Sequence, residues 1–501
     1  MVAASAVVFI AGLVLYFRTH SDLWLDEAQT VVTAQVPLSR LPAQLRLDSA
    51  PPFYYVVLHF WIRVFGTGTF AVRALSGVFA GTSLVLVYFA GKRLAGREVG
   101  WITALLLACS PFAVRYATEV RAYSLLILLS LAGFLLLDNA LASPRLSVLA
   151  GLAVVTGLLV LTHYWSFYLL GATGAVLVIC AIGGWRRRSA LMALVSMACG
   201  GLLFLPWLST FLWQVMHTGT PWGTTGLPTM LLSLPELYAD GIRAGWAVAQ
   251  PTTRGRLLAL VFVMLVGIAL LAPVTARERW RLLAWDRFRT LGVVIAVTVL
   301  LGLQLGARVG ASFESRYTSV VFAFFMLLVA VGISRIPDLG VRAAVLGGVL
   351  VLGFLGSIPN SSAPRTHGGD AARYINAHAH AGDVVGYCPD QLSPPTHRLL
   401  RRDLREFTYG GSDPASVVWS DYPARMASSN PAAFARQLDG AAGQGHRVWL
   451  FWGYGYAVLG TACPDIVEAL SRVRPGVIEP VGWPASDRFF EPSRLFVYPE
   501  H

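Results

Sequence analysis

Long apolar runs alternate with short polar segments along the chain as far as about residue 360. Most runs approach the roughly 20 residues that an α-helix needs to cross the hydrocarbon core of a bilayer. The uncharged stretch 146–185 is long enough for two helices, and the polar and aromatic cluster His163-Tyr164-Trp165 divides it. The pattern therefore predicts about eleven membrane-spanning helices. The predicted spans are 2–17, 69–91, 98–114, 119–141, 147–163, 164–184, 190–208, 257–275, 290–307, 317–334 and 343–359.

The segments between the predicted spans differ in length and charge. Short segments hold most of the excess arginine, as in Arg186–Arg188 and the cluster between 277 and 289. Short basic loops are typical of the cytoplasmic side. An odd number of spans then places the N-terminus inside and the residues after 359 outside. Residues 1–17 lack a basic flank, and a cleaved signal peptide is the alternative for that segment. The long outside segments are 18–68, 209–256 and 360–501.

Composition narrows the class of protein. The chain is 55% hydrophobic and 13% charged, whereas a soluble protein carries about 25% charged residues. This excludes a soluble enzyme, a disordered regulator and a fibre. The net charge of +12 would suggest nucleic acid, but the basic excess lies in the short loops between apolar spans. We therefore predict a polytopic α-helical membrane protein with no nucleic-acid partner.

Residues 360–501 have the composition of a globular domain. Strands and helices alternate there, which predicts a small extracytoplasmic α/β domain after a membrane module at 1–359. Cys388 and Cys463 each begin a Cys-Pro-Asp, and a disulfide between them is permitted outside the cytoplasm. The sequence leaves open whether it forms. The expected strands are 383–388, 448–452 and 495–498, and the expected helices are 370–380 and 464–471.

The first outside loop, 18–68, holds two acidic motifs and is expected to contain interfacial helices. Leu25-Asp26-Glu27-Ala28 follows the first span, and paired acids are costly there unless they are hydrated, paired or functional. Asp26 could instead cap a helix over 27–36. The second motif is Asp48-Ser49-Ala50-Pro51-Pro52, whose prolines could simply fix a turn that feeds an interfacial helix.

Further polar residues flank later spans. Their arginines could snorkel to the interface or bind a phosphate at headgroup depth, and a lone His at an interface is more often a satisfied structural residue. The predicted topology places Asp26, Asp48 and these groups at one face of the membrane, which favours a common site. The residues are Arg115, Glu119, Arg121 and Tyr123 before and at the start of span four, His163 at the end of span five, and Arg316 and Tyr317 before span ten.

The order of these motifs over about residues 20–335 resembles a family. Leu-Asp-Glu-Ala, Asp-x-x-Pro-Pro-x-Tyr-Tyr, Thr-Glu-Val-Arg-Ala-Tyr, Thr-His-Tyr and Glu-Ser-Arg-Tyr are similar to motifs of the dolichyl- or polyprenyl-phosphate-mannose-protein mannosyltransferase-like enzymes. These have the GT-C fold and are related to protein O-mannosyltransferases and lipid A aminoarabinose transferases. The resemblance implies an enzyme of the bacterial plasma membrane. It would move a mannose-like or arabinose-like sugar from a polyprenyl phosphate to a hydroxyl of a glycan, lipid or protein outside the cell.

The resemblance also implies residue roles. Asp26 matches the catalytic carboxylate, with Glu27 beside it, and Asp48 matches a second acid ahead of proline. Distant members carry a Lys near the position of His163, so His163 would contact a phosphate only when protonated. The residues that would bind the donor phosphate or substrate are Asp48, Arg115, Glu119, Arg121, Tyr123, His163, Arg316 and Tyr317.

These residue types suit the implied chemistry. A phosphate leaving group needs charge neutralisation by Arg, and an acceptor hydroxyl needs a base such as Asp26. Attack in line with the leaving group would invert the anomeric carbon. No cofactor is required, although Mg²⁺ or Mn²⁺ held by Asp26 or Asp48 is compatible with the sequence. The alternative is a membrane transporter or lipid flippase, which also places charges in a helical bundle.

Overall fold

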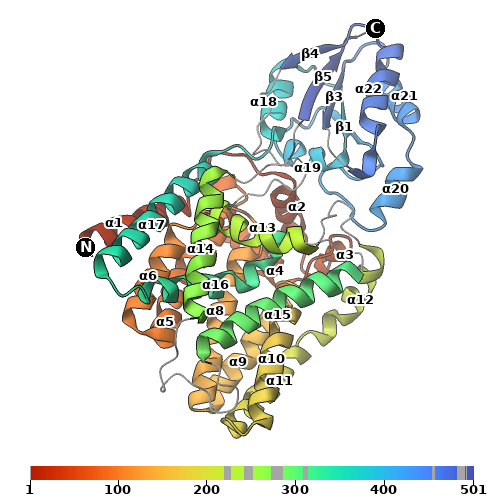
Figure 1. The fold of residues 1–501 in the computed structure, drawn as a ribbon. Coiled ribbons are helices and arrows are strands. Elements are labelled where there is room, and N and C mark those ends of the chain that lie inside the picture. Colours follow the sequence, from red (N-terminus) through yellow and green to blue (C-terminus); the bar gives the residue numbers. More distant parts are fainter. Residues whose placement is uncertain are drawn as a thin grey trace.

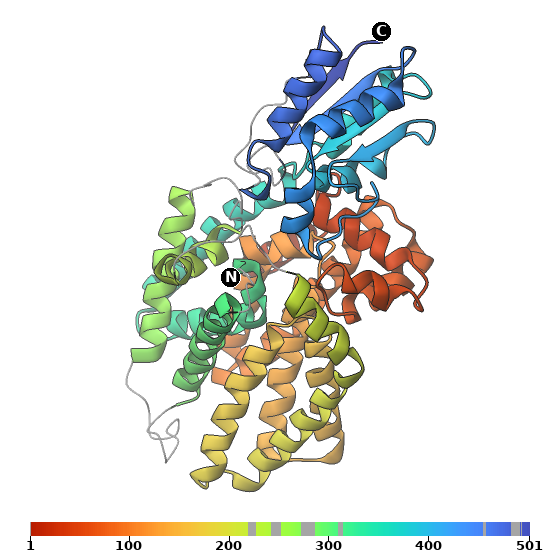
Figure 2. The same ribbon diagram turned by 90° about the vertical axis from the view of Figure 1, so that its right-hand side faces the viewer.

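A helical bundle carries a smaller domain with a β-sheet at one end (Figure 1, Figure 2). The computed structural model describes residues 2–218, 227–241, 252–271, 286–308, 314–453, 457–481, 491 and 493–500. The part of the predicted basic cluster that falls within 272–285 lies outside the described residues.

The helices of the bundle run in chain order from the N-terminus to residue 362. The first ten are α1 (Val2–Leu15), α2 (Leu25–Gln35), α3 (Leu41–Arg46), α4 (Phe53–Phe65), α5 (Thr69–Ala95), α6 (Arg97–Ala108), α7 (Pro111–Ala117), α8 (Tyr123–Ala142), α9 (Leu146–Val160) and α10 (Ser166–Ile182). The others are α11 (Arg187–Leu202), η1 (Leu205–Trp207), α12 (Leu208–His217), α13 (Leu227–Asp240), α14 (Thr253–Leu271), α15 (Arg287–Arg308), η2 (Ser315–Thr318), α16 (Ser319–Ser334) and α17 (Leu339–Ser362).

Each predicted span overlaps at least one helix within the described residues, but the predicted number of membrane crossings is not confirmed. Within the described ranges, seven helices are long and apolar enough to cross a membrane. The number is eight if α6 and α7, which meet at 60°, form one broken span. α1, α9 and α10 have only 14, 15 and 17 residues, fewer than the roughly 20 that a bilayer core requires.

Local signals explain two of these differences. The predicted span 98–114 is broken because Ser110 accepts the Ala113 N–H at 3.3 Å and Pro111 occupies the first turn of α7. A hydroxyl cap followed by proline is a signal for a new helix start. The turn around His163 ends α9 at Val160, so the polar cluster there shortens both neighbouring helices.

α16 is the central helix of the bundle. It has no charged residue and is apolar all round, as expected for a helix enclosed by others. It packs against α6, α8, α14 and α15. The approach of α14 is close enough to require glycine, because a Cβ at Gly332 would lie 2.0 Å from the Leu265 carbonyl oxygen.

The C-terminal domain is built on one five-stranded sheet of order β2-β1-β3-β5-β4. β1 pairs in parallel with β2 and β3, whereas β5 runs antiparallel to β3 and β4. Its elements are α18 (Gly368–His378), β1 (Val384–Cys388), η3 (Asp390–Leu392), α19 (Ser393–His397), β2 (Arg405–Thr408), α20 (Tyr422–Ser428), α21 (Pro431–Ala442), β3 (Val448–Gly453), η4 (Ala457–Leu459), α22 (Ala462–Val473), β4 (Ile478–Val481) and β5 (Ser493–Tyr498).

Alternate residues of the central strands enter two different cores, as the period of a strand requires. Val384 and Leu450 join the core that contains α21 and α22. Val385 and Phe451 join the core that contains α18. The expected α/β character of this region is found, and the expected strands and helices correspond to β1, β3, β5, α18 and α22. β2, β4 and the helices α19–α21 were not expected from the sequence.

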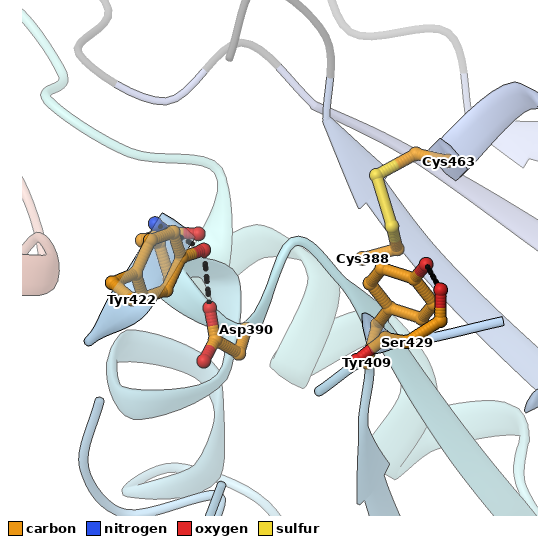
Figure 3. Close-up of a disulfide and its surroundings, with 7 residues drawn as sticks. Cys388, Asp390, Tyr409, Tyr422, Ser429 and Cys463 are labelled. Carbon is orange, nitrogen blue, oxygen red and sulfur yellow. Dashed lines mark hydrogen bonds between the residues drawn. A yellow bond between two sulfur atoms is a disulfide. The ribbon is translucent and has the colours of Figure 1, made fainter. Parts of the chain in front are cut away.

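Cys388 and Cys463 are joined by a disulfide, which connects the end of β1 to α22 (Figure 3). The surrounding side chains bond to the backbone or to each other. Tyr409 donates its hydroxyl hydrogen to the Ser429 carbonyl at 2.8 Å. Tyr422 donates to the buried Asp390 carboxylate at 2.9 Å. The pairing that the sequence left open is therefore present in the structure.

Candidate active site

Asp26 lies in the first turn of α2, where the helix faces the C-terminal domain. The helix begins at Leu25 with Trp24 in the cap position, so the alternative in which Asp26 caps a helix is wrong. The backbone N–H of Leu25 instead donates to the Glu491 carboxylate, from the C-terminal domain, at 2.9 Å. Its oxygen thereby satisfies one of the N–H groups that the first turn of a helix leaves without an intrahelical partner.

Two arginines from distant segments converge on Asp26. Arg316 Nη1 in η2 lies 3.3 Å from Asp26 Oδ2, and Arg121 Nε in the turn before α8 lies 3.9 Å from the same oxygen. Arg121 also donates to Thr30 Oγ1 at 3.1 Å. Two guanidinium groups from different elements therefore face the same carboxylate oxygen.

The Asp26 group is open enough to receive a ligand. The side chains of Asp26, Arg121 and Arg316 are 15%, 23% and 20% exposed. Asp26 Oδ2 and Arg316 Nε are nevertheless buried and have no hydrogen-bond partner within the described residues. Buried polar atoms are normally satisfied by protein, water or ligand. This arrangement therefore suits an anion that accepts from the two guanidinium groups.

Asp48 lies beside this group in the loop after α3. Its carboxylate accepts from Gln29 Nε2 at 2.7 Å and from the Tyr55 hydroxyl at 2.9 Å. Burial raises the pKa of Asp48 to about 6, against the lowering effect of Arg121 and Tyr55. The prolines that follow Asp48 do feed a helix, since α4 begins at Phe53. The interpretation of this motif as a turn before a helix is therefore confirmed, and a substrate-binding role for Asp48 stays a prediction.

Gln29 ties the same loop to the C-terminal domain. Its Nε2 also donates to the Val417 carbonyl at 3.1 Å, and its Oε1 accepts from the Val417 N–H at 3.1 Å. The neighbouring Trp419 N–H donates to the Leu47 carbonyl at 3.0 Å. The segment between β2 and α20 is therefore bonded directly to the loop that carries Asp48.

Glu27 occupies a different, enclosed position. Its carboxylate accepts from Arg73 Nε at 2.7 Å and from the Val120 N–H at 3.0 Å, and Arg365 Nη1 lies 3.8 Å away. The side chain is fully buried. Burial alone would raise the pKa of Glu27, but Arg73 and Arg365 hold it below its usual value. Glu27 therefore joins α2 to α5 and to the segment after α17.

Arg115 and Glu119 form a second enclosed ion pair. Arg115 Nη2 lies 2.9 Å from Glu119 Oε2, and the two side chains are 3% and 1% exposed. Between them in sequence, Thr118 accepts at its carbonyl from Arg365 Nη1 at 2.6 Å. Both predicted substrate-binding residues are thus closed to solvent in this structure.

Aromatic rings line the site next to Arg121 and Arg316. The ring of His163 lies between those of Tyr123 and Tyr317, with centroid distances of 5.9 and 5.1 Å. The Trp165 N–H donates to His163 Nδ1 at 3.2 Å. An accepting Nδ1 belongs to a neutral imidazole, so the protonated form that phosphate contact would require is not the one arranged here.

A metal site is not assembled from the side chains that the structure describes. Among those residues, no three His, Cys, Asp or Glu side chains gather closely enough to hold a metal ion. Asp26 faces two guanidinium groups and Asp48 accepts from an amide and a hydroxyl. The positive charge next to Asp26 in this structure is that of arginine.

Several residues that hold the site were not identified from the sequence. The sequence contains a signal for Arg73, because Arg73 is a charged residue inside the predicted span 69–91. Charged residues within membrane spans are usually paired or functional. The sequence contains no such signal for Gln29 or Glu491. Their partners lie 388 and 466 residues away in sequence, so local patterns carry no information about them.

Comparison with known proteins identifies the fold. Residues 49–213 match the family model described as dolichyl-phosphate-mannose-protein mannosyltransferase. ArnT from Cupriavidus metallidurans in the apo state is similar with a TM-score of 0.61 and 14% identity, over 99% of this chain and 98% of ArnT. The chain has the GT-C glycosyltransferase fold. The resemblance to this family is thereby confirmed, and the matched range includes neither Asp26 nor Arg316. No curated protein sequence matches the chain.

Other GT-C proteins are similar at comparable levels. ArnT bound to undecaprenyl phosphate has a TM-score of 0.58 and 15% identity, over 99% of this chain and 97% of ArnT. The Archaeoglobus fulgidus oligosaccharyltransferase has a TM-score of 0.56 and 10% identity, over 94% of this chain and 71% of its own. The arabinofuranosyltransferase AftD from Mycobacteria has a TM-score of 0.51 and 15% identity, and 42% of that longer chain is covered. At these identities the likeness establishes the fold alone.

Proposed function

We propose that the protein is a glycosyltransferase that uses a polyprenyl-phosphate sugar and acts on an acceptor hydroxyl at the extracytoplasmic face. The observation that carries this proposal is the convergence of Arg121 and Arg316 on the partly exposed Asp26. Arg316 Nε is buried and has no hydrogen-bond partner among the residues that the structure describes. The GT-C fold and the undecaprenyl phosphate bound to ArnT support the same class of donor.

The arginines and Asp26 would exchange partners when the donor binds. Phosphate oxygens would accept from Arg121 and Arg316, because guanidinium groups bind phosphate with charge-assisted hydrogen bonds. Asp26 would then be released from its ion pairs and face the acceptor hydroxyl. The arginines would neutralise the charge that the phosphate gains as the sugar leaves.

The proposed chemical step is a single displacement. The acceptor oxygen forms a bond to the anomeric carbon, and the bond from that carbon to the phosphate oxygen breaks. The bonding pair leaves with the polyprenyl phosphate, and the acceptor proton passes to Asp26. Attack opposite the leaving group would invert the anomeric configuration. A mannose-like or arabinose-like sugar and a cell-envelope glycan, lipid or protein acceptor remain the proposed substrates.

A transporter or flippase would be expected to place charged groups along the depth of the bundle. The charged groups of the proposed site instead meet at one end, where α2, η2 and the start of α8 lie together. This location favours a transferase, since a transferase needs its charges only where the phosphate lies.

The test is transfer from a panel of radiolabelled polyprenyl-phosphate sugars to membrane extracts by the purified full-length protein. One donor should support transfer, and Asp26→Asn should reduce the single-turnover rate by about a hundredfold or more. Asp22→Asn is the matched control, because Asp22 precedes α2 and pairs with the exposed Arg373 at 2.9 Å. Transfer by Asp26→Asn at the wild-type rate would remove Asp26 from the mechanism and make Asp48 the next candidate.

A further inference from the structure

A cavity lies in the bundle at the end remote from Asp26. It encloses about 240 Å³ between α8, α9, α10, α11, α15 and α16. Apolar side chains form most of its wall, including Phe134, Leu137, Leu159, Leu177, Val294 and Phe324. Nothing in the proposed transfer reaction uses this space.

Three arginines stand at the edge of this cavity. They are Arg93 at the end of α5, Arg186 before α11, and Arg287 at the start of α15. Among the described residues, Asp138 is the one carboxylate that lines it, and it lies 3.4 Å from Arg93. The charged residues of the cavity therefore carry a net positive charge.

Arg287 and Arg186 each contact neighbouring groups at this end of the bundle. Arg287 Nη1 donates to the carbonyl oxygens of Arg93 and Leu94 at 3.0 and 2.9 Å. The Arg186 guanidinium lies 5.2 Å from the centre of the Trp185 ring. Trp is typical of the interface between hydrocarbon and headgroups, so this end of the cavity is at headgroup depth.

The length of α5 gives the separation between this cavity and the proposed active site. Arg73, near the start of α5, bonds to Glu27 beside Asp26, whereas Arg93 lies at the other end of the same helix. At 1.5 Å per residue the two are about 30 Å apart along the axis. That is about the thickness of a bilayer's hydrocarbon core. A phosphate on Arg93 therefore lies in the opposite leaflet from one on Arg316.

We propose that this cavity binds an anionic membrane phospholipid, with an acyl chain among the apolar side chains and its phosphate on Arg93, Arg186 and Arg287. Basic pockets between membrane helices are suited to anionic lipid headgroups, and the charge and apolar wall match the two parts of such a lipid. Because α9, α10 and α11 form one side and α15 the other, the lipid fills the space between them. This site is independent of the proposed transfer reaction.

The test titrates the full-length protein in detergent with lipid by native mass spectrometry. Phosphatidylglycerol should bind roughly tenfold more tightly than phosphatidylcholine with the same acyl chains. The double variant Arg93→Gln/Arg186→Gln should lose that preference. Its matched control is Arg97→Gln/Arg188→Gln, which removes two exposed arginines that do not line the cavity.

A second variant fills the cavity without changing charge. Gly133→Leu should reduce binding of both lipids, since Gly133 lines the cavity and a Cβ there meets only ordinary contacts at 3.6 Å or more. Gly171→Leu is its control, on an exposed position of α10 with open space around it. The proposal would be overturned if the wild type bound the two lipids equally. It would also be overturned if the Gly133→Leu and Gly171→Leu variants bound lipid with the same affinity. Displacement of phosphatidylglycerol by a stoichiometric polyprenyl monophosphate would overturn it too, by assigning the cavity to the donor.

Discussion

The carboxylates of Asp26 and Glu27 belong to different ion-pair networks, although the residues are neighbours in α2. Asp26 is partly exposed between Arg121 and Arg316, whereas Glu27 is fully buried against Arg73. Successive residues of a helix point about 100° apart, at 3.6 residues per turn. One turn of α2 thus directs one acid towards the candidate site and the other into the junction with α5.

Glu27→Gln is expected to destabilise the protein. It would leave the Arg73 guanidinium buried without its counter-charge, which typically costs about 3–5 kcal/mol. The midpoint of thermal unfolding in detergent should fall clearly. Glu98→Gln is the control and should change this midpoint little, because the Glu98 side chain is 53% exposed in its ion pair. A Glu27→Gln protein of normal stability that lacks transfer would instead make Glu27 the reactive acid.

Arg316→Ala and Arg121→Ala are expected to weaken donor binding. A charge-assisted hydrogen bond contributes about 1.5–3 kcal/mol, so each variant should bind a polyprenyl-phosphate sugar about ten- to a hundredfold less tightly. Arg373→Ala is the control, because that side chain is 62% exposed and pairs with Asp22. Unchanged donor affinity in both variants would show that Arg121 and Arg316 only anchor the chain at the interface.

Glu491 is expected to make stability depend on pH. Burial raises its pKa from 4.5 to about 8, against the lowering effect of the Leu25 N–H. The folded state holds the Glu491 proton more tightly than the unfolded state does. The contribution of Glu491 to stability is therefore fully present below pH 4.5 and is lost as the pH rises to about 8, at about 1.4 kcal/mol per unit of pKa difference.

Glu491→Gln isolates this effect. The amide oxygen can still accept from Leu25 but does not ionise, so the variant should unfold at a higher temperature than the wild type at pH 8 and at a similar one at pH 5. Glu468→Gln, on a side chain that is 66% exposed, should leave the pH profile unchanged. This role would be contradicted if the unfolding temperature of the wild type rose between pH 5 and 8 and Glu491→Gln did not change that pH profile.

The disulfide between Cys388 and Cys463 provides a test of sidedness. Its cysteines are 75 residues apart, and closing a loop of that size is expected to stabilise the domain by roughly 4 kcal/mol. Free thiols are alkylated in intact cells before the protein is isolated. Cys388 and Cys463 should then remain unmodified until a reductant is added. Reduction should also lower the unfolding temperature. Immediate alkylation of both would indicate a reducing compartment and a cytoplasmic C-terminal domain.

Sequence periodicity predicted the helices of the bundle better than their role in the membrane. Apolar runs mark the helices because each must bury or face lipid with most of its surface. The division of the run 146–185 at His163 was predicted from the sequence, whereas the division of 98–114 was not. Ser110-Pro111 starts a new helix inside one predicted span, and the turn at His163 leaves α9 and α10 with 15 and 17 residues. The predicted count of eleven crossings is therefore not confirmed by the helices that the structure describes.

The sequence by itself determined the class of protein, the alternation of strand and helix after residue 360, and the residue types available for phosphate chemistry. These follow from local composition and period, which act over a few residues. Only the tertiary structure decided which acid faces the candidate site, because Arg73, Arg316 and Arg365 reach Asp26 or Glu27 from separate elements. It likewise decided that Gln29 and Glu491 hold α2 to the C-terminal domain. The partners in these contacts are 46 to 466 residues apart in sequence, so packing between separate segments decides which of them meet.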